Sequence, residues 1–195
     1  MEFFVFGRDC DDFDDFSPEL DEEHWTYLDA YADRLIARGP TLSESRDHSG
    51  SVHIVRLGGR AAAMAFAHNE PYWRAGLYES LEVARFRNLL GVTMWQRKRR
   101  AGAEPSWLAV SRWPVTPERP GADRRKAERD LHADRSVVFC GLLLDDAGFG
   151  TTGLVTGFDA TSPVPPAAVT GLATSIGGIH CASTVERWQI GRAHV

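Results

Sequence analysis

A histidine on a predicted helix near the start of the chain is the first residue that could do chemistry. His24 lies in the segment Glu22-Glu23-His24-Trp25, and its neighbours at i+3 and i+4, Tyr27 and Leu28, belong to an apolar stripe. An imidazole that leans toward a cavity between helix and sheet titrates near neutral pH and could exchange protons with a bound substrate. The residues alone favour the plainer alternative, a surface histidine paired with Glu22 or Glu23.

Glu70 is a second candidate because it precedes Pro71 in a loop between a predicted helix and a predicted strand. Its carboxylate could orient the His24 imidazole and stabilise the protonated ring, or it could cap a backbone amide. Tyr72 and Tyr78 follow closely. Their rings could stack on a flat substrate and their hydroxyls could donate hydrogen bonds, although core packing is the commoner use of such residues.

Apolar spacing predicts the elements that must position these side chains. Residues 3–8 form a strand, and Ser17 and Pro18 begin a helix whose apolar positions continue to Ile36, before Gly39-Pro40 ends it. Next come a polar or short extended segment over 41–50, a strand over 51–57, a helix over 60–68, a loop over 69–76 and a strand over 77–89. This order is a ferredoxin-like βαββαβ unit, which leaves one apolar sheet face to be covered.

Four landmarks in the later part of the chain repeat landmarks of the first part. Trp107–Arg112 mirrors Phe3–Arg8, and the offsets of all four matches lie between 101 and 104 residues. The other matches join 131–135 to 30–34, 153–155 to 50–52, and 185–188 to 83–86. Several matches in one order indicate an internal repeat. The predicted fold class is therefore α+β, with tandem ferredoxin-like βαββαβ units forming a pseudo-dimeric α+β barrel.

The order of motifs in residues 1–91 resembles the YCII-related family of the dimeric α+β barrel group. The shared features are a helix histidine at His24, the Gly39-Pro40 turn, the Gly50-Ser51 strand start, an acidic residue before Pro71-Tyr72, and a closing strand over 81–86. The resemblance implies that His24 is an active-site residue. The family usually has aspartate at the acidic position, where this chain has Glu70, one methylene longer.

Ser51 and His53 are further candidate substrate contacts. Ser51 follows Gly50, whose missing side chain lets a ligand approach, or it simply continues the strand. His53 alternates with Val52 and Ile54, so it faces either the barrel interior or solvent. His48, beside Asp47, is expected to be exposed. The histidines lack the spacing of a helical zinc motif, so no metal site is predicted.

The predicted domains are a YCII-like unit over 1–95, a basic linker over 96–105 and a degenerate repeat over 106–195. The run 97–100 is read as solvated linker rather than as a nucleic-acid patch. In the repeat, the position matching His24 falls near Arg125 or Lys126. His180 and Cys181 are adjacent in a strand, so they point to opposite faces and do not make a nucleophile pair.

Composition limits the partners and the compartment. The 195 residues carry a net charge of −5, which argues against nucleic-acid binding, and three cysteines do not make a disulfide framework. No apolar run is long enough to span a membrane, and no signal peptide is recognised, so a cytoplasmic location is expected. Residues 190–195 read like a translated sequencing-adapter fragment and are expected to be non-native, which excludes His194 from the site.

The predicted function is that of a cofactor-independent enzyme that transfers protons in a lyase or isomerase reaction on a small, aromatic or polyketide-like compound. This substrate class is what the resemblance implies. No phosphate-binding glycine loop precedes a helix, so no nicotinamide or flavin is expected. The alternative is a non-catalytic small-molecule-binding or accessory protein. The expected assembly is a monomeric pseudo-dimer that could associate further.

Overall fold

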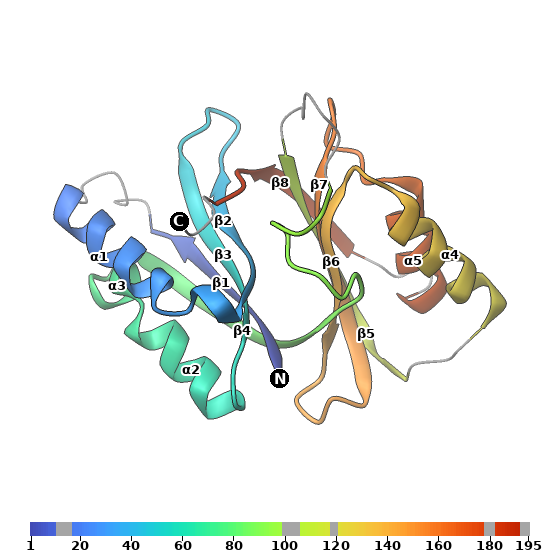
Figure 1. The fold of residues 1–195 in the computed structure, drawn as a ribbon, viewed down its shortest axis with the longest axis horizontal. Coiled ribbons are helices and arrows are strands. Elements are labelled where there is room, and N and C mark those ends of the chain that lie inside the picture. Colours follow the sequence, from blue (N-terminus) through green and yellow to red (C-terminus); the bar gives the residue numbers. More distant parts are fainter. Residues whose placement is uncertain (11–16, 99–105, 118–120, 178–181, 192–195) are drawn as a thin grey trace.

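The computed structural model describes residues 1–10, 17–98, 106–117, 121–177 and 182–191 (Figure 1). The first part of the chain forms a βαββαβ unit. Its elements are β1 (Glu2–Asp9), α1 (Pro18–Asp29), a 3-10 turn (Ala32–Arg34), β2 (Leu35–Leu42), β3 (His48–Arg56), α2 (Arg60–Asn69), α3 (Pro71–Arg74) and β4 (Tyr78–Asn88). Ser17 begins α1 as expected, because its Oγ accepts a hydrogen bond from the Leu20 amide at 3.3 Å.

The second part repeats the same order. Its elements are β5 (Ser106–Pro117), α4 (Ala122–Ala133), β6 (Val137–Leu144), β7 (Gly150–Asp159), α5 (Ala167–Gly177) and β8 (Ala182–Trp188). The tandem βαββαβ prediction is confirmed. The bounds of the two domains and of the linker stay a prediction, because residues 99–105 of that linker lie outside the described part of the chain.

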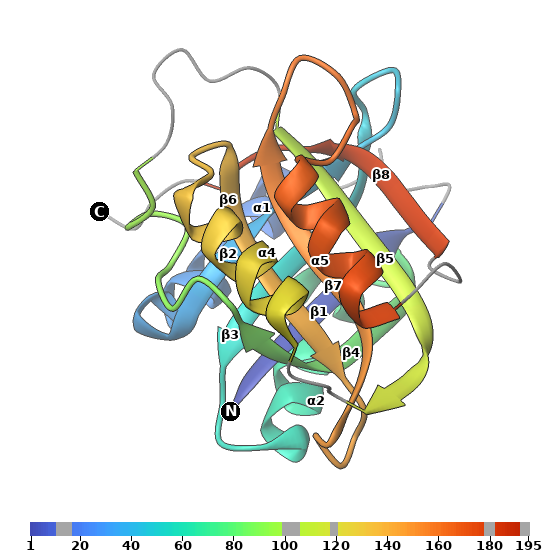
Figure 2. The ribbon, with the colours of Figure 1, turned by 90° about the vertical axis from the view of Figure 1, so that its right-hand side faces the viewer.

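The eight strands close into one barrel in the order β1-β3-β2-β8-β5-β7-β6-β4. Two junctions join the halves, β2 with β8 through Thr41 opposite Trp188, and β4 with β6 through Asn88 opposite Gly141. The helices lie outside, with α1, α2 and α3 on one flank and α4 and α5 on the other (Figures 1 and 2). No helix in the described ranges is both long enough and apolar enough to cross a membrane.

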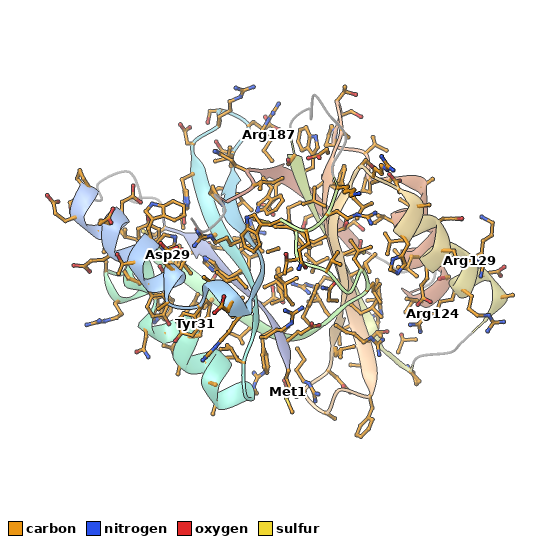
Figure 3. All side chains as sticks on the ribbon, in the orientation of Figure 1. Met1, Asp29, Tyr31, Arg124, Arg129 and Arg187 are labelled. Atoms are coloured by element: carbon orange, nitrogen blue, oxygen red, sulfur yellow. The ribbon has the colours of Figure 1, made fainter. Side chains whose placement is uncertain are left out.

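Most strands are buried on both faces, because the other half covers one face and helices cover the other, whereas β4 and β8 keep several exposed residues. Side chains fill the space between the two groups of strands (Figure 3). On β1, Phe4 and Phe6 join the central cluster, while Phe3 and Val5 pack with Leu28 and the helices. The central cluster draws on both halves and includes Val52, Ile54, Leu108, Val110, Val155 and Trp188.

Two ion pairs across the barrel show its internal two-fold character. Arg8 donates to Glu186 through Nη1 and Nη2, each at 2.9 Å, and Arg112 pairs with Glu82. Arg112 and Glu186 lie 104 positions after Arg8 and Glu82, so each half supplies an arginine to the other half's glutamate. Reciprocal contacts of this kind are the signature of a two-fold interface, here built within one chain.

The helix expected to run to Ile36 is wrong in its second half. α1 ends at Asp29, and residues 35–42, including Gly39-Pro40, are strand β2. Residues 35–39 are all buried. A strand that is covered on both faces shows a continuous apolar run, which periodicity cannot distinguish from a buried helical segment. The loop expected over 69–76 likewise contains the short helix α3.

Arg97 is not the solvated linker charge that was expected. Its guanidinium donates to the carbonyl oxygens of Val137, Leu131, His132 and Asp134 at 2.7 to 3.3 Å. Three of these carbonyls belong to the C-terminal end of α4 or the residue that ends it, where cations are favoured. The arginine therefore anchors the connection between the halves onto the second half.

The junction between β4 and β6 should tolerate no side chain at Gly141. A Cβ there would overlap the Phe86 ring and lie 2.5 Å from the Arg87 carbonyl oxygen. We expect Gly141→Ala to lower the free energy of unfolding by about 1–3 kcal/mol, as overpacking does. Gly58→Ala is the matched control because a Cβ at Gly58 meets nothing within 4 Å. Denaturant unfolding of both variants measures this difference. Equal stabilities of the two variants would contradict the close packing around Gly141.

Candidate functional site

A cavity of about 190 Å³ lies between the helices and the sheet of the first half. Helices α1 and α3 form one side of it, and strands β2 and β3 form the other. Its walls are made by Asp21, His24, Trp25, Leu28, Arg38, Gly39, Pro40, His48, Ser51, His53 and Tyr72. Most of the chain's predicted site residues therefore come together at one place, although they are far apart in sequence.

His24 and Glu70 form a buried pair beside this cavity. His24 and Leu28 are the buried residues of α1, spaced i and i+4, so the imidazole lies on the face that packs against the sheet. Nδ1 of His24 lies 2.5 Å from Oε1 of Glu70, and the two residues are 4% and 2% exposed. The surface interpretation of His24 is thus inconsistent with its position.

Glu70 makes both of the contacts that were considered for it. Glu70 is the N-cap of α3, where Oε2 accepts a hydrogen bond from the Trp73 amide at 3.0 Å while Oε1 contacts His24. Pro71 stands at the start of α3, where a backbone amide has no partner within the helix, so the missing N–H of proline costs nothing. An ionised carboxylate can only accept a hydrogen bond, so the tautomer that satisfies this contact is the one with its proton on His24 Nδ1. That arrangement leaves Nε2 as the nitrogen available to a ligand.

Tyr72 supports His24 from one side. Its ring stacks on the imidazole with a centroid separation of 4.2 Å and an interplanar angle of 13°. Its hydroxyl donates to Asp21 Oδ1. Burial, followed by this hydrogen bond and the charge of Asp21, raises the pKa of Tyr72, so the phenol stays protonated and remains a donor.

Tyr78 is not among the residues that line the cavity. It is 5% exposed and packs edge-on against Tyr72, with its ring over Gly7 of β1. Burial and then the charge of Glu70 hold the pKa of Tyr78 well above its usual range. The structure therefore places Tyr78 behind Tyr72, as packing support.

Neither position expected for His53 is correct. Val52 and Ile54 face the barrel interior, so His53 faces the helices, where it is 3% exposed. Its ring lies 5.9 Å from that of His24 and 5.8 Å from that of Phe66 on α2. The two alternatives failed because neither allowed Val52 and Ile54 to face the interior while helices covered the opposite face of β3. Ser51, also 3% exposed, lines the cavity from the same face of β3.

His53 should make the fold sensitive to mild acid. Burial, and then the nearby charges of His24, Arg38 and His48, lower the pKa of His53 well below 6.5. Below pH 6.5 the unfolded chain therefore binds a proton that the folded chain does not, so stability decreases as the pH is lowered, by at most about 1.4 kcal/mol per pH unit. We expect the difference in unfolding free energy between pH 7 and pH 5 to shrink in His53→Gln and to persist in His132→Gln. An unchanged pH slope in His53→Gln would show that His53 is protonated alike in both states.

His48 is not the exposed histidine that was expected. Its Nδ1 lies 2.5 Å from Oδ2 of Asp9, and its side chain is 23% exposed while that of Asp9 is 5% exposed. Nε2 of His48 lies 3.4 Å from Oγ of Ser51. The antiparallel register of β1 and β3, which sets Arg8 opposite Gly50, brings this pair together. Pairing those two strands from the sequence was the signal that could have found it.

Arg38 and Asp21 are cavity residues that sequence reasoning missed. Arg38 is 1% exposed, its guanidinium lies 5.3 Å from the centroid of the Trp25 ring, and Nη1 and Nη2 each lie 3.4 Å from Asp29 Oδ1. The mistaken helix over residues 35–38 hid Arg38, because its place in β2 turns it toward α1. Nothing in the spacing of Asp21 distinguished it from other helix carboxylates.

In the second half, apolar side chains fill the space between the helices and the sheet that holds the cavity in the first half. The buried pair of α4 is Ala127 and Leu131, with the spacing of His24 and Leu28, so alanine stands where the first half has its histidine. This alanine, Ala127, lies two residues after Arg125, near which the equivalent of His24 was expected. Leu154 likewise stands where β3 has Ser51, 103 positions earlier. His180 and Cys181 lie outside the described residues.

Among the described residues, no group of three or more histidine, cysteine, aspartate or glutamate side chains is arranged to hold a metal ion. The buried Cys140 does not belong to the site, and burial raises the pKa of its thiol to about 12.

Several solved structures are similar to this chain. A 5-chloro-2-hydroxyhydroquinone dehydrochlorinase from Burkholderia phenoliruptrix AC1100, solved with 2,5-dihydroxybenzoquinone, is 24% identical over 45% of this chain and 94% of that chain, with a TM-score of 0.41. A candidate monooxygenase from Lactobacillus acidophilus NCFM is 8% identical over 97% of this chain and 93% of that chain, with a TM-score of 0.50. Another from Fusobacterium nucleatum subsp. nucleatum ATCC 25586 is 13% identical over 97% and 91%, with a TM-score of 0.48.

The likeness to the Lactobacillus protein extends over both halves and concerns the fold alone. Among curated proteins, none matches this chain. The family model described as YCII-related domain matches residues 1–87, the span that contains every residue lining the cavity. The part of the chain that holds the candidate site therefore matches the YCII-related domain.

Proposed function

We propose that this protein is a cofactor-independent enzyme that transfers protons in a lyase or isomerase reaction on a small ring compound. The observation that carries the proposal is the buried His24–Glu70 pair at the wall of a 190 Å³ cavity. The carboxylate holds Nδ1–H and stabilises the imidazolium, while Nε2 takes up or delivers the substrate proton.

The cost of burying this pair supports a role beyond folding. Removing an imidazole and a carboxylate from water is unfavourable unless both are paired. The equivalent layer of the second half is packed with Ala127, Leu131 and Leu154, so this architecture folds without polar groups there. Polar groups retained where apolar packing is sufficient are typical of a functional site.

The size of the cavity limits the substrate. A cavity of about 150 Å³ in another protein accommodates benzene, so 190 Å³ admits one ring with a few substituents. Tyr72 and Trp25 offer aromatic surface to such a ring, and Ser51 and Asp21 offer polar contacts. The substrate class is therefore a single-ring phenol, quinone or lactone. 2,5-Dihydroxybenzoquinone has this size and serves as a binding probe.

His24→Ala tests the proposal. We expect turnover of small phenolic and lactone substrates to fall about 10²–10⁴-fold while the thermal unfolding transition remains. His132→Ala, which removes an exposed histidine of α4, is the matched control and should keep full activity. Unchanged turnover in His24→Ala would remove His24 from the mechanism. Binding without turnover in the unmodified protein would favour the accessory, ligand-binding alternative.

A further inference from the structure

The cavity holds a second histidine–carboxylate pair that repeats the arrangement of the first. His48 Nδ1 lies 2.5 Å from Asp9 Oδ2, and His24 Nδ1 lies 2.5 Å from Glu70 Oε1. In both pairs the carboxylate engages Nδ1, which leaves Nε2 as the nitrogen directed elsewhere. Both histidines line the same cavity. The two pairs arise from different elements, α1 with the cap of α3 and β3 with the end of β1.

Tyr72 and Ser51 connect the two pairs. The Tyr72 ring stacks on His24 with centroids 4.2 Å apart and meets His48 edge-on with centroids 6.4 Å apart. Nε2 of His48 lies 3.4 Å from the Ser51 hydroxyl, which is itself part of the cavity wall. A hydroxyl both donates and accepts, so Ser51 can pass a proton between His48 and a ligand.

The two histidines differ in their access to water. His24 is 4% exposed, whereas the side chain of His48 is 23% exposed. A group that exchanges protons with solvent between turnovers needs such access, and a group that abstracts a proton from carbon benefits from a dry site. The exposures therefore suit different roles in one reaction.

We propose that His48, oriented by Asp9 and acting through Ser51, is the second proton-transfer group of this site, and that the substrate is an enolisable ring compound whose proton moves from one atom to another. The inference rests on the proposed function. His24 Nε2 removes a proton from a ring carbon next to a carbonyl, and the electron pair of that C–H bond forms the enolate. His48 delivers a proton through Ser51 Oγ to the far end of the conjugated system, where a new C–H bond forms as the carbonyl is restored. When the product leaves, the emptied cavity lets His24 release its proton to water, and His48 takes a proton up.

The test uses α-angelica lactone, a single-ring β,γ-unsaturated lactone, in D₂O followed by proton NMR. Removal of a C3 proton and its return appear as deuterium at C3, and delivery to C5 appears as the conjugated isomer. We expect the unmodified protein to catalyse both events. We expect His48→Gln and Asp9→Asn to keep the exchange at C3 and to lose at least about tenfold in isomerisation, while His24→Gln loses both. His132→Gln is the matched histidine control.

The outcomes separate the inference from the proposal beneath it. Isomerisation in folded His48→Gln and Asp9→Asn at the rate of the unmodified protein overturns the role of His48 and leaves His24 in place. Loss of both events in these variants, with unchanged thermal unfolding, also overturns it, because His48 would then act in the first step. Absence of both events in the unmodified protein overturns the proposed function itself. Two variants are used so that a folding defect in either leaves the other to decide.

Discussion

Glu70→Gln is expected to lower turnover about 10²–10⁴-fold while the protein stays folded. The amide oxygen can still accept the hydrogen bond from the Trp73 amide that caps α3. The variant loses the negative charge that orients His24 Nδ1–H and stabilises the imidazolium. The effect should therefore appear in kcat rather than in stability, and steady-state kinetics with thermal unfolding on the same samples measures both.

Two further variants separate capping from catalysis. Glu70→Ala removes both contacts and should lower stability as well as turnover, by about 1 kcal/mol for the lost cap. Glu70→Asp restores the residue usual in the family but shortens the arm that spans His24 and Trp73, so we expect intermediate turnover. If Glu70→Gln keeps full kcat, the carboxylate is structural and His24 does not depend on it.

Residues 1–98 expressed alone are expected to form a homodimer rather than a stable monomer. Without the second half, the sheet face that carries Phe4, Phe6, Val52 and Ile54 loses its cover. A second copy can supply that cover, because the contacts between the halves are reciprocal. Arg8 would then pair with Glu82 of the other copy, in place of its pairing with Glu186. Sedimentation equilibrium measures the association.

Charge reversal tests the geometry of that dimer. Arg8→Glu should weaken association by at least tenfold, and adding Glu82→Arg should restore it, since the pair is reversed rather than lost. Arg34→Glu changes an exposed charge that lies over the Tyr31 ring of its own half, and it serves as the control. A monomer that unfolds cooperatively at micromolar concentration would show that the first half does not need the cover.

The repeat could be predicted from the sequence because its landmarks are strand starts and helix ends with local patterns. Trp107–Arg112 and Phe3–Arg8 both proved to be first strands, β5 and β1. β2 could not be predicted, because residues 35–39 are buried on both faces and the apolar spacing of Leu35 and Ile36 continues that of α1. Residues 35–39 form a strand rather than a helix because β2 pairs with β3 and β8, and the local sequence does not encode that pairing.

The candidate site could be predicted only in part from the sequence. His24 and Glu70 were found because a resemblance singled out a helix histidine and an acidic residue before Pro71, although apolar spacing alone favoured a surface histidine. Their contact joins residues 46 positions apart and depends on how α3 packs against α1. The Asp9–His48 pair depends on strand register, and the side on which His53 lies depends on which layer covers each face. These contacts are set by tertiary packing, and no pattern in the neighbouring sequence indicates them.

A crystal structure with 2,5-dihydroxybenzoquinone soaked or co-crystallised tests the central claim most directly. The claim predicts the ring in the cavity between α1 and β3, against Tyr72, with one of its oxygen atoms about 2.6–3.2 Å from Nε2 of His24 while Nδ1 stays on Glu70. A ring bound outside that cavity, or one inside it that turns no polar atom toward His24, would contradict a site built for proton transfer.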